Sequence, residues 1–235
     1  MDINLNKIPE HIFKIQDCDL AEDFIAIGIE LDDNGIGHHS GIFISLNNEL
    51  VLFHFDGSVV KIENANDLNQ WFLLNKLVIF EGEDDFIINF KAHCEIICEE
   101  ATPEFGFLFD GSYYDINGKY YTETEINDVT TCVGFCIKVI QGYLNSSNYI
   151  DLTGWNIDSL DDYKLKNNEF YEYQLDLLKE KYPSRIDEIK DKYFKRILPS
   201  ELTSAGFCDT LPITKQNTDY LKPTVEMVLQ TKRLS

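Results

Sequence analysis

Two strand-like runs on either side of a tight turn constrain this chain more than any other feature. Residues 40–45 and 50–55 are rich in β-branched and aromatic side chains, and Asn47 and Asn48 lie between them. Asparagine tolerates the positive φ angles that a two-residue hairpin turn requires. A third run, residues 58–62, follows the next turn. The pattern predicts an antiparallel meander of three strands.

Histidines lie near both ends of the predicted hairpin. His39 comes just before the first run and His54 lies in the second. A turn centred on Asn47 would bring these two side chains nearly opposite each other on one face of the sheet. His38 is adjacent to His39, so on a regular strand it would point to the other face.

A thiol lies at the start of a second informative segment. Residues 129–143 are apolar nearly all round, which predicts a helix in the core of a domain. Thr130 and Thr131 are suitable N-cap residues, and Cys132 would then lie in the first turn. Helix amides and the macrodipole stabilise a thiolate there. The alternative is that Cys132 is a small apolar core residue, as many buried cysteines are.

Together these segments resemble a known superfamily. The run 39–44 is similar to the His-x-Gly-Ile-Tyr strand of the circularly permuted, NlpC-like papain-fold cysteine hydrolases, which include relatives of lecithin retinol acyltransferase. In that superfamily the histidine strand precedes a cysteine-led helix, which the run 131–135 resembles. A second histidine on the next strand, here His54, is similar to the acyltransferase branch. The resemblance is confined to short patches and leaves residues 155–235 unexplained.

The resemblance implies roles for three residues. Cys132 would attack a carbonyl, His39 would act as general base, and His54 would orient His39. Asp56 is an alternative for the third role, and the amide of Cys132 would be one oxyanion donor. The implied activity is that of a cysteine hydrolase or acyltransferase, which cleaves an amide or ester through an acyl-thioester. Amide hydrolysis of a peptide or a cell-wall-like fragment is the narrower expectation.

The expected fold class is α+β, with an antiparallel sheet packed on a central helix that bears Cys132. Residues 1–150 would form the permuted papain-like catalytic core, and residues 151–235 a helical extension packed on it. Within that extension, apolar residues recur at three- and four-residue steps over 158–195, and Pro183 would separate two helices. Residues 66–75 favour a short helix and residues 77–80 a strand.

The charge balance limits the partners. The chain has 41 acidic and 20 basic residues, a formal net charge of -21. Such a chain is repelled by nucleic acid phosphates and by anionic lipid, so neither is expected as a primary partner. Catalysis would require a peptide-like or acyl small-molecule substrate. The second hypothesis is a non-catalytic acidic binding protein, such as an immunity-like inhibitor of a basic partner, because charge complementarity speeds such an association.

The sequence also gives expectations about location and metals. It shows no signal peptide pattern and no long apolar run, so we expect a cytoplasmic protein with its six cysteines reduced. A zinc site is conceivable from His93, Cys94 and Cys98 together with Cys132 and Cys136. Their four-residue spacing is not the two-residue spacing of structural zinc motifs. No metal and no cofactor are therefore expected.

Overall fold

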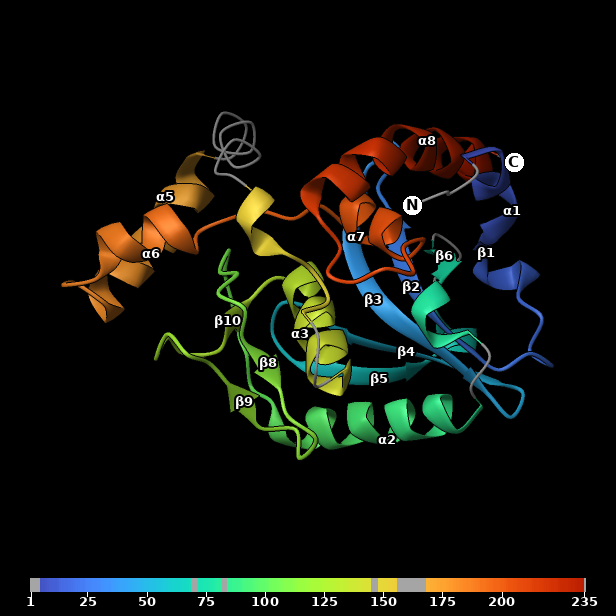
Figure 1. Ribbon diagram of the computed structural model, residues 1–235, viewed down its shortest axis with the longest axis horizontal. Coiled ribbons are helices and arrows are strands. Elements are labelled where there is room, and N and C mark those ends of the chain that lie inside the picture. The colour runs from blue at the N-terminus through green and yellow to red at the C-terminus, as the bar shows by residue number, and fades with distance from the viewer. Residues whose placement is uncertain (1–4, 69–71, 82–83, 145–147, 156–167, 235) are drawn as a thin grey trace.

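A six-stranded antiparallel sheet is the centre of the fold (Figure 1). The structure is a computed structural model, and it describes residues 5–68, 72–81, 84–144, 148–155 and 168–234. The strand order in the sheet is β1-β6-β2-β3-β4-β5, and every neighbouring pair is antiparallel. The predicted α+β class with an antiparallel sheet is confirmed.

The sheet strands are β1 (Ile12–Lys14), β2 (Phe24–Leu31), β3 (Gly37–Leu46), β4 (Glu49–Phe55), β5 (Val60–Asn64) and β6 (Phe72–Lys76). Short strands outside the sheet are β7 (Glu104–Phe105), β8 (Tyr113–Tyr114), β9 (Tyr120–Tyr121) and β10 (Val129–Thr130). The α-helices are α1 (Ile8–His11), α2 (Asp84–Glu100), α3 (Cys132–Leu144), α5 (Asn168–Lys181), α6 (Ile186–Lys192), α7 (Pro199–Ala205) and α8 (Lys215–Leu234). Single 3-10 turns lie at Leu5–Lys7, Ile15–Asp17, Ala65–Asp67, Val78–Phe80 and Leu152–Gly154.

The turn between β3 and β4 sets the register of the hairpin. Asn47 and Asn48 have φ angles of 54° and 65°, and Leu46 pairs with Glu49 on either side of them. Two consecutive positive φ angles in a two-residue loop match the twist of the flanking strands. The predicted register placed His39 nearly opposite His54, and the observed register differs from it. A Cβ built on Gly41 would lie 3.0 Å from the Cβ of His54. His54 therefore lies across from Gly41, and His39 is diagonal to His54 on the same face.

Helix α3 is fixed at its start by a cap and along its length by aromatic packing. The amide of Gly134 donates to Oγ1 of Thr131 at 3.0 Å, so Thr131 is the N-cap and Cys132 is the first helical residue. The ring of Phe135 lies 5.2 Å from that of Phe53 and 6.1 Å from that of Phe55. Helix α3 thus packs on the hairpin, and α2 lies beside it on the same side of the sheet (Figure 1).

One stretch differs from its predicted secondary structure. Residues 66–75 favoured a helix, of which 69–71 lie outside the described residues, and Phe72–Lys76 is strand β6. Strand β6 pairs with β2 on one side and β1 on the other, so sheet pairing overrides the local preference. The strand predicted at 77–80 is instead a 3-10 turn at Val78–Phe80.

The C-terminal helices pack in two separate places. Helix α5 ends before Pro183 and helix α6 begins after it, as predicted. Both helices cover the segment 107–129 through a small cluster of buried side chains around Phe194. Helices α7 and α8 pack on the same face of the sheet as α3, nearer to β2, β6 and β1 (Figure 1). Their buried side chains, among them Leu202 and Leu221, belong to the main core.

The turn gives the first prediction. Asn48→Gly should raise the free energy of unfolding by about 0.5–1 kcal/mol, because glycine adopts positive φ without steric cost. Asn48→Ala should lower it by about 1 kcal/mol, since a Cβ without a local hydrogen-bonding group disfavours this conformation. Urea unfolding of the three proteins measures both changes. Equal midpoints for the two variants would contradict the role given to the turn.

Candidate functional site

A pocket of about 400 Å³ opens where the hairpin meets the N-terminus of α3. It lies at the end of β3 and β4 remote from the Asn47–Asn48 turn. Its lining residues are Glu30, His38, His39, His54, Phe55, Asp56, Gly57, Phe105 and Cys132. The pocket therefore brings together the three residues that sequence reasoning selected, Cys132, His39 and His54.

The two histidines form part of a hydrogen-bonded chain. Nε2 of His39 lies 2.8 Å from Nδ1 of His54, and Nε2 of His54 lies 2.9 Å from Oε2 of Glu63. His54 is buried, and the rings of His39 and His54 meet edge to face. The predicted contact between the two histidines is present, although their register is offset.

The chain of hydrogen bonds defines the tautomers of the neutral rings. A carboxylate only accepts, so Nε2 of His54 carries a proton and donates to Glu63. Nδ1 of a neutral His54 must then accept, and Nε2 of His39 must donate to it. Nδ1 of His39 is left with its lone pair, which is the property that a general base needs.

Electrostatics keeps His39 neutral. Burial is the largest cause of a pKa that is lowered to about 4, and the neighbouring His54 and His38 add to it. Asp56 acts in the opposite direction without reversing the shift. His39 is therefore an uncharged imidazole at neutral pH, and a weaker base than a solvent-exposed histidine.

Glu63 is a member of the site that sequence reasoning missed. The third strand was predicted to end at residue 62, whereas β5 continues to Asn64. In the register of β4 and β5, Lys61 pairs with His54 and Glu63 pairs with Leu52, which puts Glu63 diagonal to His54. Extending the alternating pattern of this strand by two residues would have identified it.

Asp56, the alternative third residue, has a different structural role. Its carboxylate accepts hydrogen bonds from the amides of Ser58 and Val59 at 2.8 and 2.9 Å, and it forms an ion pair with Lys61. These donors hold its pKa well below the ordinary value even though burial opposes them. Asp56 is thus occupied in the turn between β4 and β5, and Glu63 is the carboxylate that contacts His54.

A local irregularity in β3 places both neighbouring histidines at the pocket. Glu30 pairs with His39 and Leu31 pairs with Gly37, so the register shifts here and His38 is an extra residue. A bulge of this kind lets successive side chains reach the same region. His38 lies 3.4 Å from the carboxylate of Glu30 and lines the pocket. His38 and His39 therefore both line the pocket, whereas on a regular strand they would point to opposite faces.

The environment of Cys132 has two opposing effects. Burial is the largest influence and raises the pKa of the thiol above its ordinary value. The backbone amide of Ser40 and the first amides of α3 act in the opposite direction, as does the charge of Arg196. Burial prevails, so Cys132 is a protonated thiol at neutral pH, aimed at amides that would stabilise negative charge.

The structure leaves one expected contact unmade. Cys132 and His39 line the same pocket, but no hydrogen bond joins them among the described residues. His39 instead interacts with His54 and lies edge-on to Phe72. The resting site is thus a neutral thiol and a neutral imidazole, and not a thiolate–imidazolium ion pair.

The described residues contain neither a metal cluster nor a membrane-spanning helix. No group of three or more His, Cys, Asp or Glu side chains within the described ranges is arranged to hold a metal ion. All six cysteines are free thiols. Within the described part of the chain, no helix is both long enough and apolar enough to cross a membrane.

Comparison with known proteins gives no relative from which a function could be transferred. No family model, no curated protein and no solved structure matches the chain. The geometry of the pocket is therefore the basis on which a function can be proposed.

The lowered pKa of His39 predicts how stability depends on pH. An unfolded histidine takes up a proton below about pH 6.5, whereas the folded His39 stays neutral down to about pH 4. The free energy of unfolding should therefore fall as the pH falls through this window. His39→Gln, which keeps a donor for His54, should flatten the dependence in urea unfolding experiments.

A matched control uses another histidine. His11→Gln changes an exposed residue outside the pocket. The free energy of unfolding of this variant should depend on pH as that of the unaltered protein does. Buried His93, whose pKa burial also lowers, and carboxyls such as Asp56 and Asp110, whose pKa values are held low, contribute to the slope that remains in His39→Gln. Equal slopes for His39→Gln and the unaltered protein would contradict the assigned protonation state.

Proposed function

We propose that the protein is a cysteine hydrolase or acyltransferase that forms an acyl-thioester on Cys132. The observation that carries the proposal is the common opening of two features onto one pocket. One is a thiol at the first residue of a capped helix, and the other is the His39–His54–Glu63 chain. The relation to the permuted papain-like superfamily, with a central cysteine-bearing helix, is part of this proposal.

In the proposed reaction His39 is the base and Cys132 the nucleophile. The thiol proton passes to Nδ1 of His39 as sulfur bonds to the carbonyl carbon of an amide or ester. The amides of Cys132 and Val133 hold the developing oxyanion, because the first amides of a helix lack partners within it. The C–N or C–O bond then breaks, and the leaving group takes the proton from His39.

The second half of the reaction regenerates the thiol. Water loses a proton to His39 and attacks the thioester carbon, and the sulfur leaves and recovers that proton. In transfer, an alcohol or amine replaces the water. His54 and Glu63 are positioning residues, because they fix the tautomer of His39 and do not touch the substrate. Because Cys132 and His39 do not contact each other in this structure, the proposed proton transfer requires the thiol and the imidazole to approach in the substrate complex.

The charges around the pocket favour particular substrates. Its lining contains the carboxylates of Glu30 and Asp56, and none of the nine described residues that form it is Lys or Arg. An anionic group next to the scissile bond would be repelled, whereas a neutral or basic group would be accepted. We therefore propose a neutral or basic amide or ester, with amide hydrolysis as the narrower proposal.

The alternative proposal is a non-catalytic acidic protein that binds a basic partner. The net charge of -21 and the raised pKa of Cys132 favour it. In that case the pocket would hold inert side chains, and Cys132 would be a packing residue. The two proposals differ in whether Cys132 can be acylated.

Acylation by an activated ester separates the two proposals. Incubation with p-nitrophenyl acetate should add one acetyl group, visible by intact-protein mass spectrometry and located at Cys132 by peptide mapping. Cys132→Ala should abolish this adduct with an unchanged circular dichroism spectrum, and Cys98→Ala should retain it. Acetylation spread over several cysteines, or equal in Cys132→Ala, would overturn catalysis and favour the binding protein.

The positioning chain gives a further prediction. Glu63→Gln should lower the rate of Cys132 acylation by about 10- to 100-fold, because the partner that fixes the ring of His54 is weakened. The reaction of Cys132 with iodoacetamide at about pH 10 should be unchanged, because a thiolate formed by solvent needs no base. A loss of both reactions would mean that Glu63 acts on folding and not on the base.

A further inference from the structure

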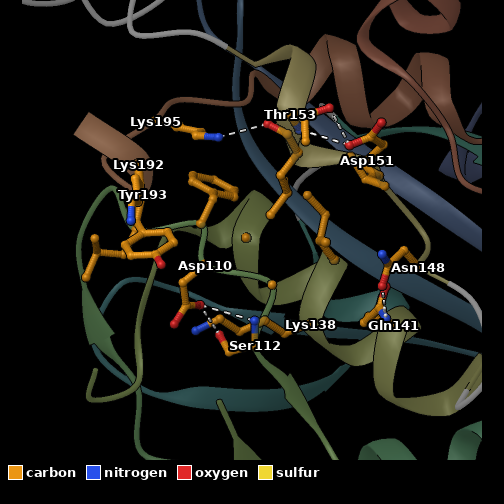
Figure 2. Close-up of a pocket in the computed structure, with 17 residues that line it drawn as sticks. Asp110, Ser112, Lys138, Gln141, Asn148, Asp151, Thr153, Lys192, Tyr193 and Lys195 are labelled. Atoms are coloured by element: carbon orange, nitrogen blue, oxygen red, sulfur yellow. Dashed lines mark hydrogen bonds between the residues drawn. The ribbon is translucent and has the colours of Figure 1, made fainter. Parts of the chain in front are cut away.

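A second cavity, of about 370 Å³, lies on another side of α3 (Figure 2). Its walls come from α3, the segment 108–112, the segment 148–153 and the end of α6 with the residues that follow it. It shares no lining residue with the pocket at Cys132. Its volume falls in the range of cavities that bind small molecules.

The middle of this cavity is apolar. Phe109, Ile137, Ile150 and Leu152 line it, and Gly134 exposes the surface of α3 without a side chain. Polar groups lie around the edge, with Gln141 and Asn148 on one side and Lys192 and Lys195 on another (Figure 2). A ligand for such a space has an apolar body and a polar group at one end.

Two of the charged residues in the lining, Asp110 and Lys138, already form hydrogen bonds with other residues of the protein. Asp110 accepts hydrogen bonds from Ser112 and from Thr122 and Thr124, which hold its pKa low even though burial opposes them. Lys138 donates to Asp128 at 2.8 Å and to the carbonyl of Val129 at 3.2 Å. It also lies 4.8 Å from the centre of the Tyr120 ring.

Lys195 differs, because most of its donor capacity is unused. Its half-buried ammonium donates to the carbonyl of Leu152 at 2.8 Å, and no second hydrogen bond to it is present among the described residues. An ammonium has three donors, and burial with too few partners lowers the pKa of Lys195. The nearby carboxylate of Asp151 is bound by the amide and hydroxyl of Thr153. Lys192 lies on the same side of the cavity as Lys195 (Figure 2).

We propose that this cavity binds a small carboxylic acid with an apolar body. The carboxylate accepts hydrogen bonds from Lys195 and faces Lys192, and the body packs between Phe109, Ile137 and Leu152. The cavity has three lysines and two aspartates in its lining, in a chain with twice as many acidic as basic residues. Lys138 is paired with Asp128 and Lys192 with Glu188, so the ammonium of Lys195, with its unused donors, is the group that favours an anion over a cation. The proposal goes beyond the reaction at Cys132 and does not depend on it.

Three probes with the same chain and different head groups test the proposal. Decanoate, decanol and decylamine are titrated into the full-length protein by isothermal calorimetry. Decanoate should bind at least about tenfold more tightly than the other two, because hydrogen bonds to charged groups stabilise a buried anion. Equal affinities for the three probes, or tighter binding of decylamine, would overturn the proposal.

Variants locate the binding. Lys195→Met should reduce the affinity for decanoate to that for decanol, whereas Lys179→Met, which changes an exposed lysine on α5, should leave it unchanged. Leu152→Trp should fill the cavity and weaken all three probes, with thermal unfolding as the check on folding. Binding that survives both Lys195→Met and Leu152→Trp lies elsewhere and would contradict the assignment. Cys132→Ala should bind decanoate with unchanged affinity. A failure of decanoate to bind is therefore distinguishable from a failure of Cys132 to be acylated.

Discussion

The packing of Phe135 against Phe53 and Phe55 is the interaction on which the candidate site depends. These three rings fix α3 against the β3–β4 hairpin, with Phe135 and Phe53 both fully buried. Phe135 comes three residues after Cys132, the first residue of α3, so its position also fixes that of Cys132. Edge-to-face and tilted ring contacts of this kind contribute about 0.5–1.5 kcal/mol each beyond the area they bury. The site is thus held by core packing, and not by contacts between its polar groups.

Burial has opposite consequences for the reactivity of the two groups. It raises the pKa of the Cys132 thiol and lowers that of the His39 imidazole, so both are uncharged in the resting protein. A proton transfer between them creates two charges in a space that disfavours charge. The amides at the start of α3 offset this cost for the sulfur, and the negative charge of Asp56 offsets part of it for the imidazole. The proposed chemistry depends on these compensations.

Much of the candidate site was predictable from sequence. The cap at Thr131, the helix that begins at Cys132 and the shared face of His39 and His54 all follow from local patterns. The register was not predictable, because either asparagine could have centred the turn. Glu63 was missed because the end of a strand is set by its partner, here β4, and not by its own residues.

The sequence by itself determined the α+β class, the hairpin, the buried helix and the strongly acidic surface. Each follows from local periodicity, turn chemistry or charge count, which do not depend on distant residues. Only the tertiary structure decided that Phe72–Lys76 is a strand and that the bulge at His38 turns two histidines to one pocket. It also decided that Lys195 lies over an apolar cavity. These outcomes depend on pairing and packing between segments remote in the chain. The energies of those contacts exceed local preferences, which are about a few tenths of a kcal/mol per residue.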